Sequence, residues 1–357
     1  MIESAAGTPE NFHDSNQSMR RAVARRKIHP VFRVETLAKN RSNGDRTPKI
    51  PLPAHPIERR EPLPWERPKP AEEDPGAPAR LQKILNSPSY RLPVEDSDFL
   101  GALNTRGLRL QMDYLKAELS LRRQEVAQTI VVFGSTRICE PSVARKRVEA
   151  ARAALDAANG SYDAFVLARK LAVAEKILAK SHYYDVAREL GRLVGEANRA
   201  SSGAKTLIVT GGGPGIMEAA NRGAFDVGAK SIGLNISLPQ EQYPNPYVTP
   251  ELCFQFHYFA LRKMHFLQRA RALVAFPGGY GTFDELFEVL TLVQTRKKRP
   301  IPIVLVGEEF WRKAVDFDFL AEEGVVDLED RELFWFAETA QDIFDSLSKW
   351  ERAAPAI

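Results

Sequence analysis

Short runs of β-branched and aliphatic residues alternate with stretches of helical apolar spacing along the C-terminal two thirds of the chain. Helical spacing in GLRLQMDYLKAELSLRRQ precedes the first run, TIVVFGS, at residues 129–135. The later runs are TLIVT, SIGLNIS, LCFQFH, ALVAF, IPIVLVG and ELFWFAET. Strands and helices in this order predict an α/β fold, a Rossmann-like doubly wound parallel sheet with helices on both faces, from about residue 125 to 352.

Two stretches of helical spacing stand out within this alternation. Residues 143–200 contain only helical patterns, and the second strand, TLIVT, follows them at residues 206–210. Near the C-terminus, FWRKAVDFDFLAEEG predicts a single helix after IPIVLVG. We therefore expect a long helical excursion between the first two strands.

Residues 1–93 are rich in Pro, Arg, Asn and Ser and have neither helical nor strand periodicity. Such a composition cannot bury enough apolar surface to offset the ordering entropy, so we predict a largely disordered basic extension before a folded domain at 94–352. A basic tail can contact nucleic acid or an acidic partner. We favour a solvated, functionally silent extension and do not expect nucleic acid as a partner.

Composition places the chain among soluble globular proteins. It has 357 residues, of which 44% are hydrophobic, and a net charge of +4. No apolar run approaches the roughly 20 residues that span a bilayer, and the N-terminus lacks the apolar centre of a signal peptide, so we expect a cytoplasmic protein without membrane contact. Cys139 and Cys253 have no metal-binding spacing, and we expect buried free thiols, no metal and no cofactor. We expect His257 and His265, between aromatic neighbours, to be packed rather than catalytic.

Two glycine-rich turns follow predicted strands. GGGPG, at residues 211–215, comes after TLIVT, and PGGYGTFDE, at residues 277–285, comes after ALVAF. In an open parallel sheet, ligands bind beyond the carboxyl ends of the strands. Glycines there let backbone N–H groups approach an anion at a helix N-terminus, although one such turn alone can serve backbone geometry only. Two such turns in one sheet predict a ligand that carries phosphate.

Known nucleotide motifs narrow the class of ligand. GGGPGIME departs from the dinucleotide pattern because Ile216 occupies the place of the third glycine, and the next strand ends near Asn235 rather than an acidic residue. Neither turn contains the P-loop of nucleoside triphosphatases, so a mononucleotide with one phosphate remains. Thr282 and Glu285 also match a capping box, in which the glutamate only bonds the helix N-terminus. Judged on these residues alone, that structural interpretation is the stronger one.

Four motifs in order resemble one protein family. PGGYGTFDE fits PGGxGTxxE, the signature of the LOG family of nucleotide phosphoribohydrolases, cytokinin-activating enzymes once described as lysine decarboxylases. TGGGPGIMEAANRGA at 210–224 resembles their other glycine turn, VVFGSTR at 131–137 their first strand, and FALRKMHF at 259–266 their segment with an Arg-Lys pair. The resemblance covers roughly residues 96–350.

The resemblance implies hydrolysis of the N-glycosidic bond of a nucleoside 5′-monophosphate, either AMP or a cytokinin riboside 5′-monophosphate. The products are a free base and ribose 5-phosphate. Glu285 matches the family's catalytic glutamate, and Arg262 matches its arginine. A carboxylate suits this reaction because positive charge builds at the anomeric carbon in the transition state. Arginine stays protonated, so its planar fork can hold a phosphate or ribose oxygen but cannot act as a base.

Substrate contacts are expected from both glycine turns and from neighbouring side chains. They involve Ser135, Gly211, Gly212, Gly213, Glu218, Lys263, Gly278, Gly279, Tyr280, Gly281, Thr282 and Thr291. Ser135 can equally cap the next element, and Glu218 and Asn221 can pair with neighbours instead of lining a pocket. Lys263 and Thr291 are included because they match family binding positions.

The chain also departs from the short plant-type members of the family. It has the N-terminal tail, a helical insertion at about 141–185, and the long loop LPQEQYPNPYVTPELCFQFH, in which Glu241 is the nearest candidate for a further substrate-binding acid. The base preference therefore stays open. The resemblance implies a homodimer or a larger assembly of dimers. A non-catalytic nucleotide-binding or carrier protein of the same fold is the alternative function, and the presence of Glu285 argues against it.

Overall fold

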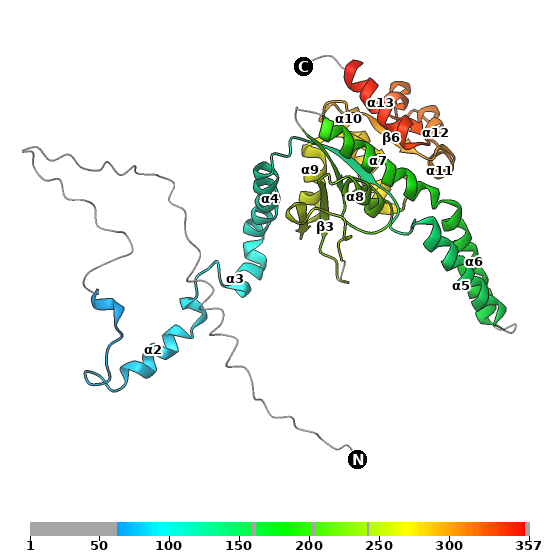
Figure 1. Cartoon of the computed structure of the whole chain (residues 1–357). Coiled ribbons are helices and arrows are strands. Elements are labelled where there is room, and N and C mark those ends of the chain that lie inside the picture. Colours follow the sequence, from blue (N-terminus) through cyan, green and yellow to red (C-terminus); the bar gives the residue numbers. More distant parts are fainter. Residues whose placement is uncertain (1–62, 159–161, 201–204, 241–242, 354–357) are drawn as a thin grey trace, which may run out of the picture. The chain divides into compact units, whose positions relative to one another are not determined.

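The computed structural model describes residues 63–158, 162–200, 205–240 and 243–353 (Figure 1). Seven parallel strands form one sheet in the order β4-β3-β2-β1-β5-β6-β7. The strands are β1 Gln128–Phe133, β2 Thr206–Thr210, β3 Ser231–Ile236, β4 Cys253–Phe256, β5 Ala270–Ala275, β6 Ile303–Val306 and β7 Trp335–Ala337. The prediction of an α/β fold with a doubly wound parallel sheet is confirmed.

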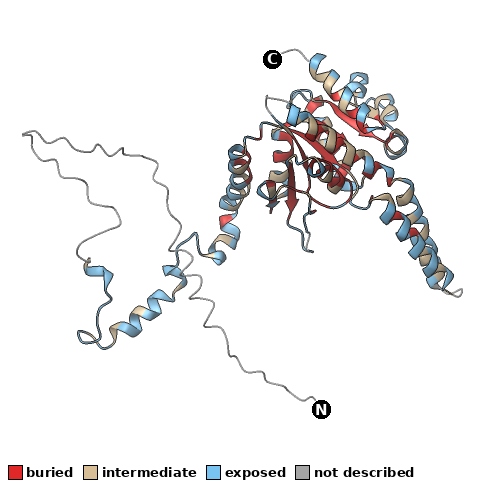
Figure 2. Cartoon of the chain, in the orientation of Figure 1, coloured by how far each residue is buried: buried red, intermediate tan, exposed pale blue. Residues whose placement is uncertain are grey.

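Helices cover both faces of this sheet. Residues that alternate along β1 belong to two different cores, since Val131 packs with one cluster of buried side chains and Val132 with the other. Buried residues are concentrated on the strands and on the inner faces of the surrounding helices (Figure 2). The longer helices are α4 Arg106–Arg123, α5 Pro141–Asp156, α6 Tyr162–Ala179, α7 His182–Ala200, α8 Ile216–Asp226, α9 Phe259–Gln268, α10 Tyr280–Gln294 and α13 Ala340–Ala353.

The helical excursion after β1 consists of three helices. α5 and α6 pack against each other, and α7 then returns the chain to the sheet next to α8. α7 and α8 approach closely because side chains at Gly191 and Gly223 would overlap the backbone carbonyls of Ala220 and Arg188. This contact fixes the position of α8, which begins directly after the first glycine turn.

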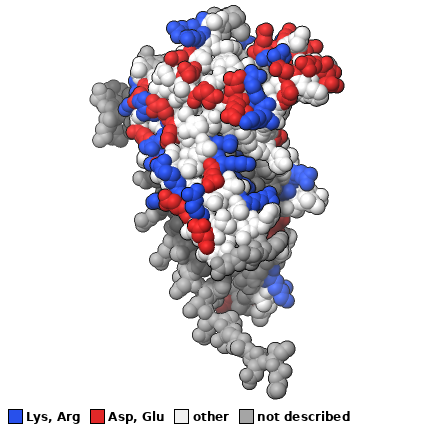
Figure 3. All heavy atoms as spheres, turned by 90° about the vertical axis from the view of Figure 1, so that its right-hand side faces the viewer, with Lys and Arg blue, Asp and Glu red and all other residues white. Residues whose placement is uncertain are grey.

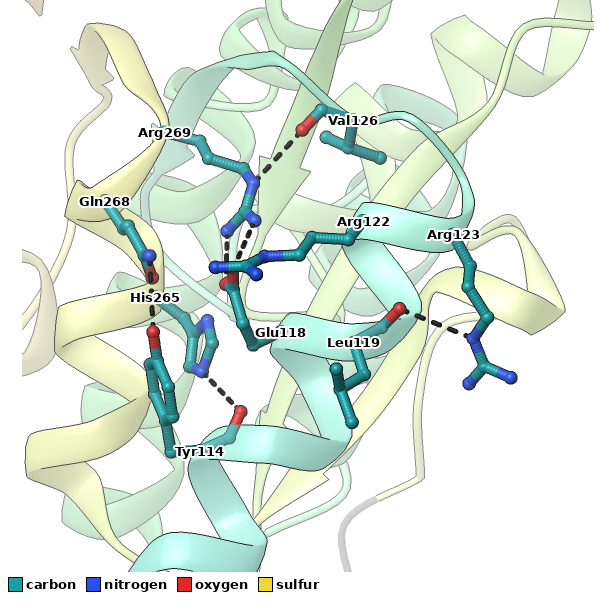
Figure 4. Close-up of polar contacts among 9 residues, drawn as sticks. All are labelled: Tyr114, Glu118, Leu119, Arg122, Arg123, Val126, His265, Gln268 and Arg269. Carbon is teal, nitrogen blue, oxygen red and sulfur yellow. Dashed lines mark hydrogen bonds and ion pairs between the residues drawn. The ribbon is translucent and has the colours of Figure 1, made fainter.

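A buried polar cluster joins α4 to α9 and to the residue that follows it (Figure 4). The carboxylate of Glu118 accepts hydrogen bonds from both Nη groups of Arg269, at 2.9 and 3.0 Å, and from Arg122. These bonds lower the pKa of Glu118, although its burial opposes the shift. His265 stacks on Tyr114, and its Nε2 lies 3.2 Å from the Tyr114 carbonyl oxygen, so this histidine is packed as expected. His257 is exposed, so the expectation that it is packed was wrong.

Two parts of the fold differ from the sequence-based expectations. The segment FWRKAVDFDFLAEEG lies in two helices, α11 Glu308–Ala314 and α12 Phe317–Glu322, because the Asp316 side chain caps the second by accepting the Phe319 amide. The two cysteine thiols are free but half-buried rather than buried.

The chain divides into two units between residues 81 and 82. Residues 1–62 of the predicted extension lie outside the described residues. The described remainder contains regular structure that we did not expect, above all helix α2 Ala77–Leu85, which has no buried residue. Its apolar side chains recur at helical spacing, but proline-rich flanks mask the pattern. α3 Ser97–Gly101 and short 3₁₀ turns, at Pro64–Glu66, Pro88–Tyr90, Leu103–Thr105, Pro250–Leu252 and Leu328–Leu333, complete the elements.

Surface charge and hydropathy do not change this description of the fold. Basic and acidic side chains both occur over the face shown in Figure 3. Across the described residues, no helix combines the length and apolar character that crossing a membrane requires. Those residues also contain no group of three His, Cys, Asp or Glu side chains arranged to hold a metal ion.

Candidate active site

A cavity of about 1170 Å³ opens at the carboxyl ends of the central strands. β1 and β5 are neighbours in the sheet, and the chain leaves them in opposite directions, toward β2 on one side and β6 on the other. Such a point of divergence is where open α/β sheets bind ligands. The loops after β1, β2, β3 and β5 line the cavity, together with residues of α6, α10 and α11.

The loop after β1 ties the two glycine turns together. The Ser135 amide donates to the Pro277 carbonyl at 3.0 Å, and the Ser135 carbonyl accepts the Ile216 amide at 3.1 Å. Gly215 has φ +76°, and a side chain there would overlap the Ser135 carbonyl oxygen, so glycine is required. The Ser135 hydroxyl accepts the Arg137 amide at 3.1 Å, which orders this loop instead of capping α5.

The second glycine turn presents the N-terminus of α10 to the cavity. Gly279 is the N-cap residue, and no side chain caps the helix. Within the described part of the chain, the amides of Gly278, Gly279, Tyr280 and Gly281 have no backbone or side-chain acceptor, whereas the Thr282 amide donates to the Gly279 carbonyl at 2.9 Å. Unpaired amides at a helix N-terminus are suited to an anion.

Glycine at position 278 is also required by close packing. A side chain there would overlap the Thr282 side chain, whose Cβ and hydroxyl oxygen lie against this backbone. Gly279 and Gly281 face open space instead, and the Tyr280 side chain is 95% exposed at the rim of the cavity. The turn therefore leaves room above its amides for a bound group.

Glu285 lies one turn into α10 and lines the cavity. It does not form the capping box that its sequence position allows, because Thr282 lies inside the helix and Gly279 is the N-cap. The side chain is 5% exposed and has no hydrogen bond or ion pair with any described residue. Burial raises its pKa to about 7, against the opposing charges of Lys263 and Arg262. A carboxyl group in this state can exchange a proton at neutral pH.

Arg262 enters the same cavity from α9. Its Nε donates to the Leu234 carbonyl at 2.9 Å, and its guanidinium lies over the ring of Phe266, 5.2 Å from the centroid. A side chain at Gly211 would overlap this guanidinium, so the first glycine turn makes room for the arginine. The Nη groups have no acceptor among the described residues, and burial lowers the pKa of Arg262.

The cavity thus brings together nine of the residues predicted from the sequence. They are Ser135, Gly211, Arg262, Gly278, Gly279, Tyr280, Gly281, Thr282 and Glu285. Gly212 and Gly213 lie in the turn beside it, where their carbonyls accept hydrogen bonds from Asn245. Asn221, which had two open interpretations, is fully buried and pairs with Thr210 and Asn245.

Besides Gly212 and Gly213, three predicted contact residues do not line this cavity. Glu218 accepts a hydrogen bond from the Tyr184 hydroxyl at 2.8 Å, so it pairs with a neighbour. Lys263 forms ion pairs with Asp284 at 2.8 Å and Glu288 at 3.1 Å. Lys263 and Thr291 line a separate hollow of about 460 Å³ on the outer side of α10. Glu241 lies outside the described residues.

Sequence reasoning missed the cavity wall that the helical excursion provides. Val173, Lys176, Ile177 and Lys180 line the cavity from α6 and the residue that follows it, and Arg137 lines it from the loop after β1. Their spacing places them on one face of a helix, a signal that was present in the sequence. Its meaning depended on where α6 lies, which the pattern alone does not give. Phe310, Ala314 and Val315 were missed for the same reason.

Comparisons with known proteins agree with the motifs. Residues 217–347 match the family model described as possible lysine decarboxylase. Cytokinin riboside 5′-monophosphate phosphoribohydrolase LOG3 of Arabidopsis thaliana is 30% identical over 176 residues, which are 48% of this chain and 77% of that protein. The probable cytokinin riboside 5′-monophosphate phosphoribohydrolase LOGL3 of Oryza sativa subsp. japonica is 28% identical over 152 residues, which are 40% of this chain and 68% of that protein.

Among solved structures, the Moco carrier protein of Chlamydomonas reinhardtii matches with a TM-score of 0.34 and 17% identity, over 64% of this chain and 99% of that one. The identity to the Arabidopsis enzyme, and the share of that enzyme which this chain covers, are high enough to assign the chain to the same family. The chain therefore belongs to the LOG family, whose curated relatives are phosphoribohydrolases.

Proposed function

We propose that this protein hydrolyses the N-glycosidic bond of a nucleoside 5′-monophosphate, either AMP or a cytokinin riboside 5′-monophosphate, to the free base and ribose 5-phosphate. One observation carries the proposal. A buried carboxyl group, Glu285, lines the cavity without a partner among the described residues and has a pKa of about 7. A group with no structural role, poised to gain or lose a proton beside an anion-binding helix end, is typical of an active site.

The phosphate is expected on the N-terminus of α10. The unpaired amides of Gly278–Gly281 point to a single anionic group there, and the Thr282 hydroxyl lies against the same turn. Glu285 follows three residues after Thr282, close to one helical turn along the axis. A nucleotide held by its 5′-phosphate in this way has its ribose near Glu285.

The ionised form of Glu285 accepts a proton from the attacking water. The water oxygen then bonds to C1′ while the C1′–N bond breaks, and the base leaves with that electron pair. The proton that Glu285 accepted passes through solvent to the departing base, which regenerates the carboxylate. The negative charge of Glu285 also stabilises the positive charge that develops on the ribose. The desolvation that raises the pKa of Glu285 makes its carboxylate a stronger base at neutral pH.

Arg262 is proposed to orient the ribose or the phosphate. Its Nε and its ring contact fix the guanidinium in place, and its Nη groups have no acceptor in the described chain. A preformed fork of this kind can bind two substrate oxygens with little loss of side-chain entropy. Ile236, Leu238 and Phe259 line the cavity beyond it and offer apolar surface for a planar base.

The protein is further proposed to act as a dimer. Phe287 on α10 is exposed and lines the hollow together with Lys263 and Thr291, and Met264, the residue after Lys263 on α9, is exposed as well. A second copy covering this face would place those two family positions at an interface. Sedimentation of the purified protein at several concentrations measures this directly, and a monomer at micromolar concentration would contradict it.

A carrier that binds nucleotide without turnover is the alternative. Such a protein gains nothing from burying an unpaired carboxyl group, because desolvation makes the charged form unfavourable. The discriminating experiment incubates the full-length protein with a panel of nucleoside 5′-monophosphates and measures free base chromatographically. Release of base from at least one of them supports the proposal. Binding of nucleotide without any release would favour the carrier.

A further inference from the structure

The α5–α6 hairpin adds a positively charged wall to the cavity. Val173, Lys176 and Ile177 project into it from α6, and Lys180 follows two residues before α7 begins. Arg137, in the loop that leads into α5, lines the same space. Residues at these spacings share one face of a helix, so the hairpin presents two apolar and two basic side chains together.

None of these three basic side chains is neutralised by an ion pair or a hydrogen bond within the described part of the chain. Elsewhere on the hairpin, Arg152 pairs with Glu175 at 3.0 Å. The pKa of Glu309 is lowered mainly by its hydrogen bond and ion pair with Lys313, and the charge of Lys180 makes only a smaller contribution. The contrast indicates that Arg137, Lys176 and Lys180 are left available for an anion that the protein does not supply.

Acidic residues of the cavity do not balance these charges. Asp284 is engaged by Lys263, and Glu285 has a pKa of about 7 and is therefore only partly ionised at neutral pH. Arg262 adds a fourth cation. Basic side chains that converge on a partly enclosed space concentrate anionic ligands there.

One phosphate does not use all of these groups. The amides of Gly278–Gly281 already provide donors for a single phosphate, and the cavity of about 1170 Å³ exceeds the size typical of sites for small ligands. Gly307, the N-cap residue of α11, lies against both the Tyr183 hydroxyl and Pro277, the first residue of the second glycine turn. The Lys180 carbonyl accepts the Tyr183 amide at 3.1 Å, so Lys180 lies on the side of the cavity near this turn.

We propose that the cavity binds nucleoside 5′-diphosphates and 5′-triphosphates more tightly than monophosphates, with Arg137, Lys176 and Lys180 holding the additional phosphates. The inference rests on the proposed function only in placing the first phosphate on the N-terminus of α10. It extends the ligand class of the site and gives the hairpin a role in specificity. Such nucleotides would compete with a monophosphate substrate.

The test measures dissociation constants of AMP, ADP and ATP calorimetrically, in magnesium-free buffer at fixed low salt, for three forms of the full-length protein. These are the wild type, the double variant Lys176→Gln/Lys180→Gln, and the control Lys146→Gln/Lys170→Gln. The control removes the same charge from exposed positions of the same hairpin that do not line the cavity. Thermal unfolding confirms that all three forms are folded.

Wild type and control are expected to bind ADP and ATP about tenfold or more tightly than AMP, since charged hydrogen bonds to phosphate are strong. The cavity variant should lose this preference and change its AMP affinity only a few-fold. Equal or weaker binding of ATP by the wild type would overturn the proposal, as would an unchanged preference in the cavity variant. Base release from AMP, measured on the same samples, tests the proposed hydrolysis separately. If the wild type releases base from AMP but does not prefer ADP and ATP, only the proposed role of the hairpin is contradicted.

Discussion

Two buried glutamates of this protein lie next to arginines and differ in almost every other respect. Glu118 is 2% exposed and accepts hydrogen bonds from Arg269 and Arg122, which lower its pKa. Glu285 is 5% exposed, has no partner in the described chain, and has a pKa raised to about 7 by burial. Similar burial thus gives opposite electrostatics, because one carboxylate is satisfied by the fold and the other is not.

The comparison separates a structural carboxylate from one that is available for chemistry. The Glu118 cluster joins α4 to the end of α9 (Figure 4). Glu285 bonds to no other described residue and faces a cavity. Burial alone is therefore a poor guide to function, whereas burial without a partner, in a cavity, is informative.

The largest expected effect distinguishes the two residues by activity. Glu285→Gln removes the group that accepts the proton from water, so base release should fall by about 10³-fold. Nucleotide binding should persist because the amides of Gly278–Gly281 are unchanged. Chromatographic assay of free base measures the loss, and wild-type turnover by this variant would show that Glu285 is not catalytic.

Stability should fall when the other glutamate, Glu118, is replaced. Glu118→Gln leaves the guanidinium of Arg269, which is largely buried, without its carboxylate, and the free energy of unfolding should fall by about 3 kcal/mol. Urea denaturation measures this change. The folded fraction should keep its base-release activity, and a specific loss of turnover with unchanged stability would assign Glu118 to the site instead.

The pH dependence of stability should have opposite signs at the two residues. Glu285 has a folded-state pKa above the unfolded value, so the folded wild type holds an extra proton and loses stability as pH rises from about 4.5 to 7. Glu285→Gln lacks this loss. Between pH 4 and pH 8, its free energy of unfolding should therefore rise relative to that of the wild type by up to about 3 kcal/mol.

Glu118, with a lowered pKa, contributes stability that is present above its unfolded pKa and is lost as pH falls below it. The penalty of Glu118→Gln should therefore shrink in acid. Thermal unfolding of both variants across pH measures the two trends. Parallel trends in the two variants would contradict the assigned protonation states.

The smallest expected effect is in the pH profile of catalysis. If the carboxylate of Glu285 is the active form and its pKa is about 7, kcat/KM should rise about fivefold from pH 6 to pH 7 and level off above pH 8. The phosphate of the free substrate also titrates near pH 6 and affects the profile of kcat/KM. The pH profile of kcat, to which the free substrate does not contribute, is therefore the matching control. A profile flat from pH 5 to 8 would show that Glu285 does not titrate in this range.

Much of the fold and part of the site could be predicted from the sequence. The strands follow from β-branched runs such as TIVVFGS, and the glycine turns follow from their place after strands. The pairing of Glu118 could not be predicted, since its partner Arg269 is 151 positions away along the chain. Glu285 was ambiguous as well. Only the position of the helix start, at Gly279 rather than Thr282, removes the capping interpretation.

The helical excursion shows the same limit of prediction from sequence. Its helices were predicted, but the contribution of Lys176 and Lys180 to the cavity depends on how α6 packs beside the loop after β1. Local pattern determines that a helix forms and which face is apolar. Tertiary packing determines which surface that face meets.

A crystal structure of Glu285→Gln with AMP bound tests the central claim most directly. The 5′-phosphate is expected on the amides of Gly278–Gly281, with C1′ beside residue 285 and the Arg262 guanidinium on ribose or phosphate oxygens. AMP bound outside this cavity, or bound with its ribose turned away from residue 285, would contradict the account.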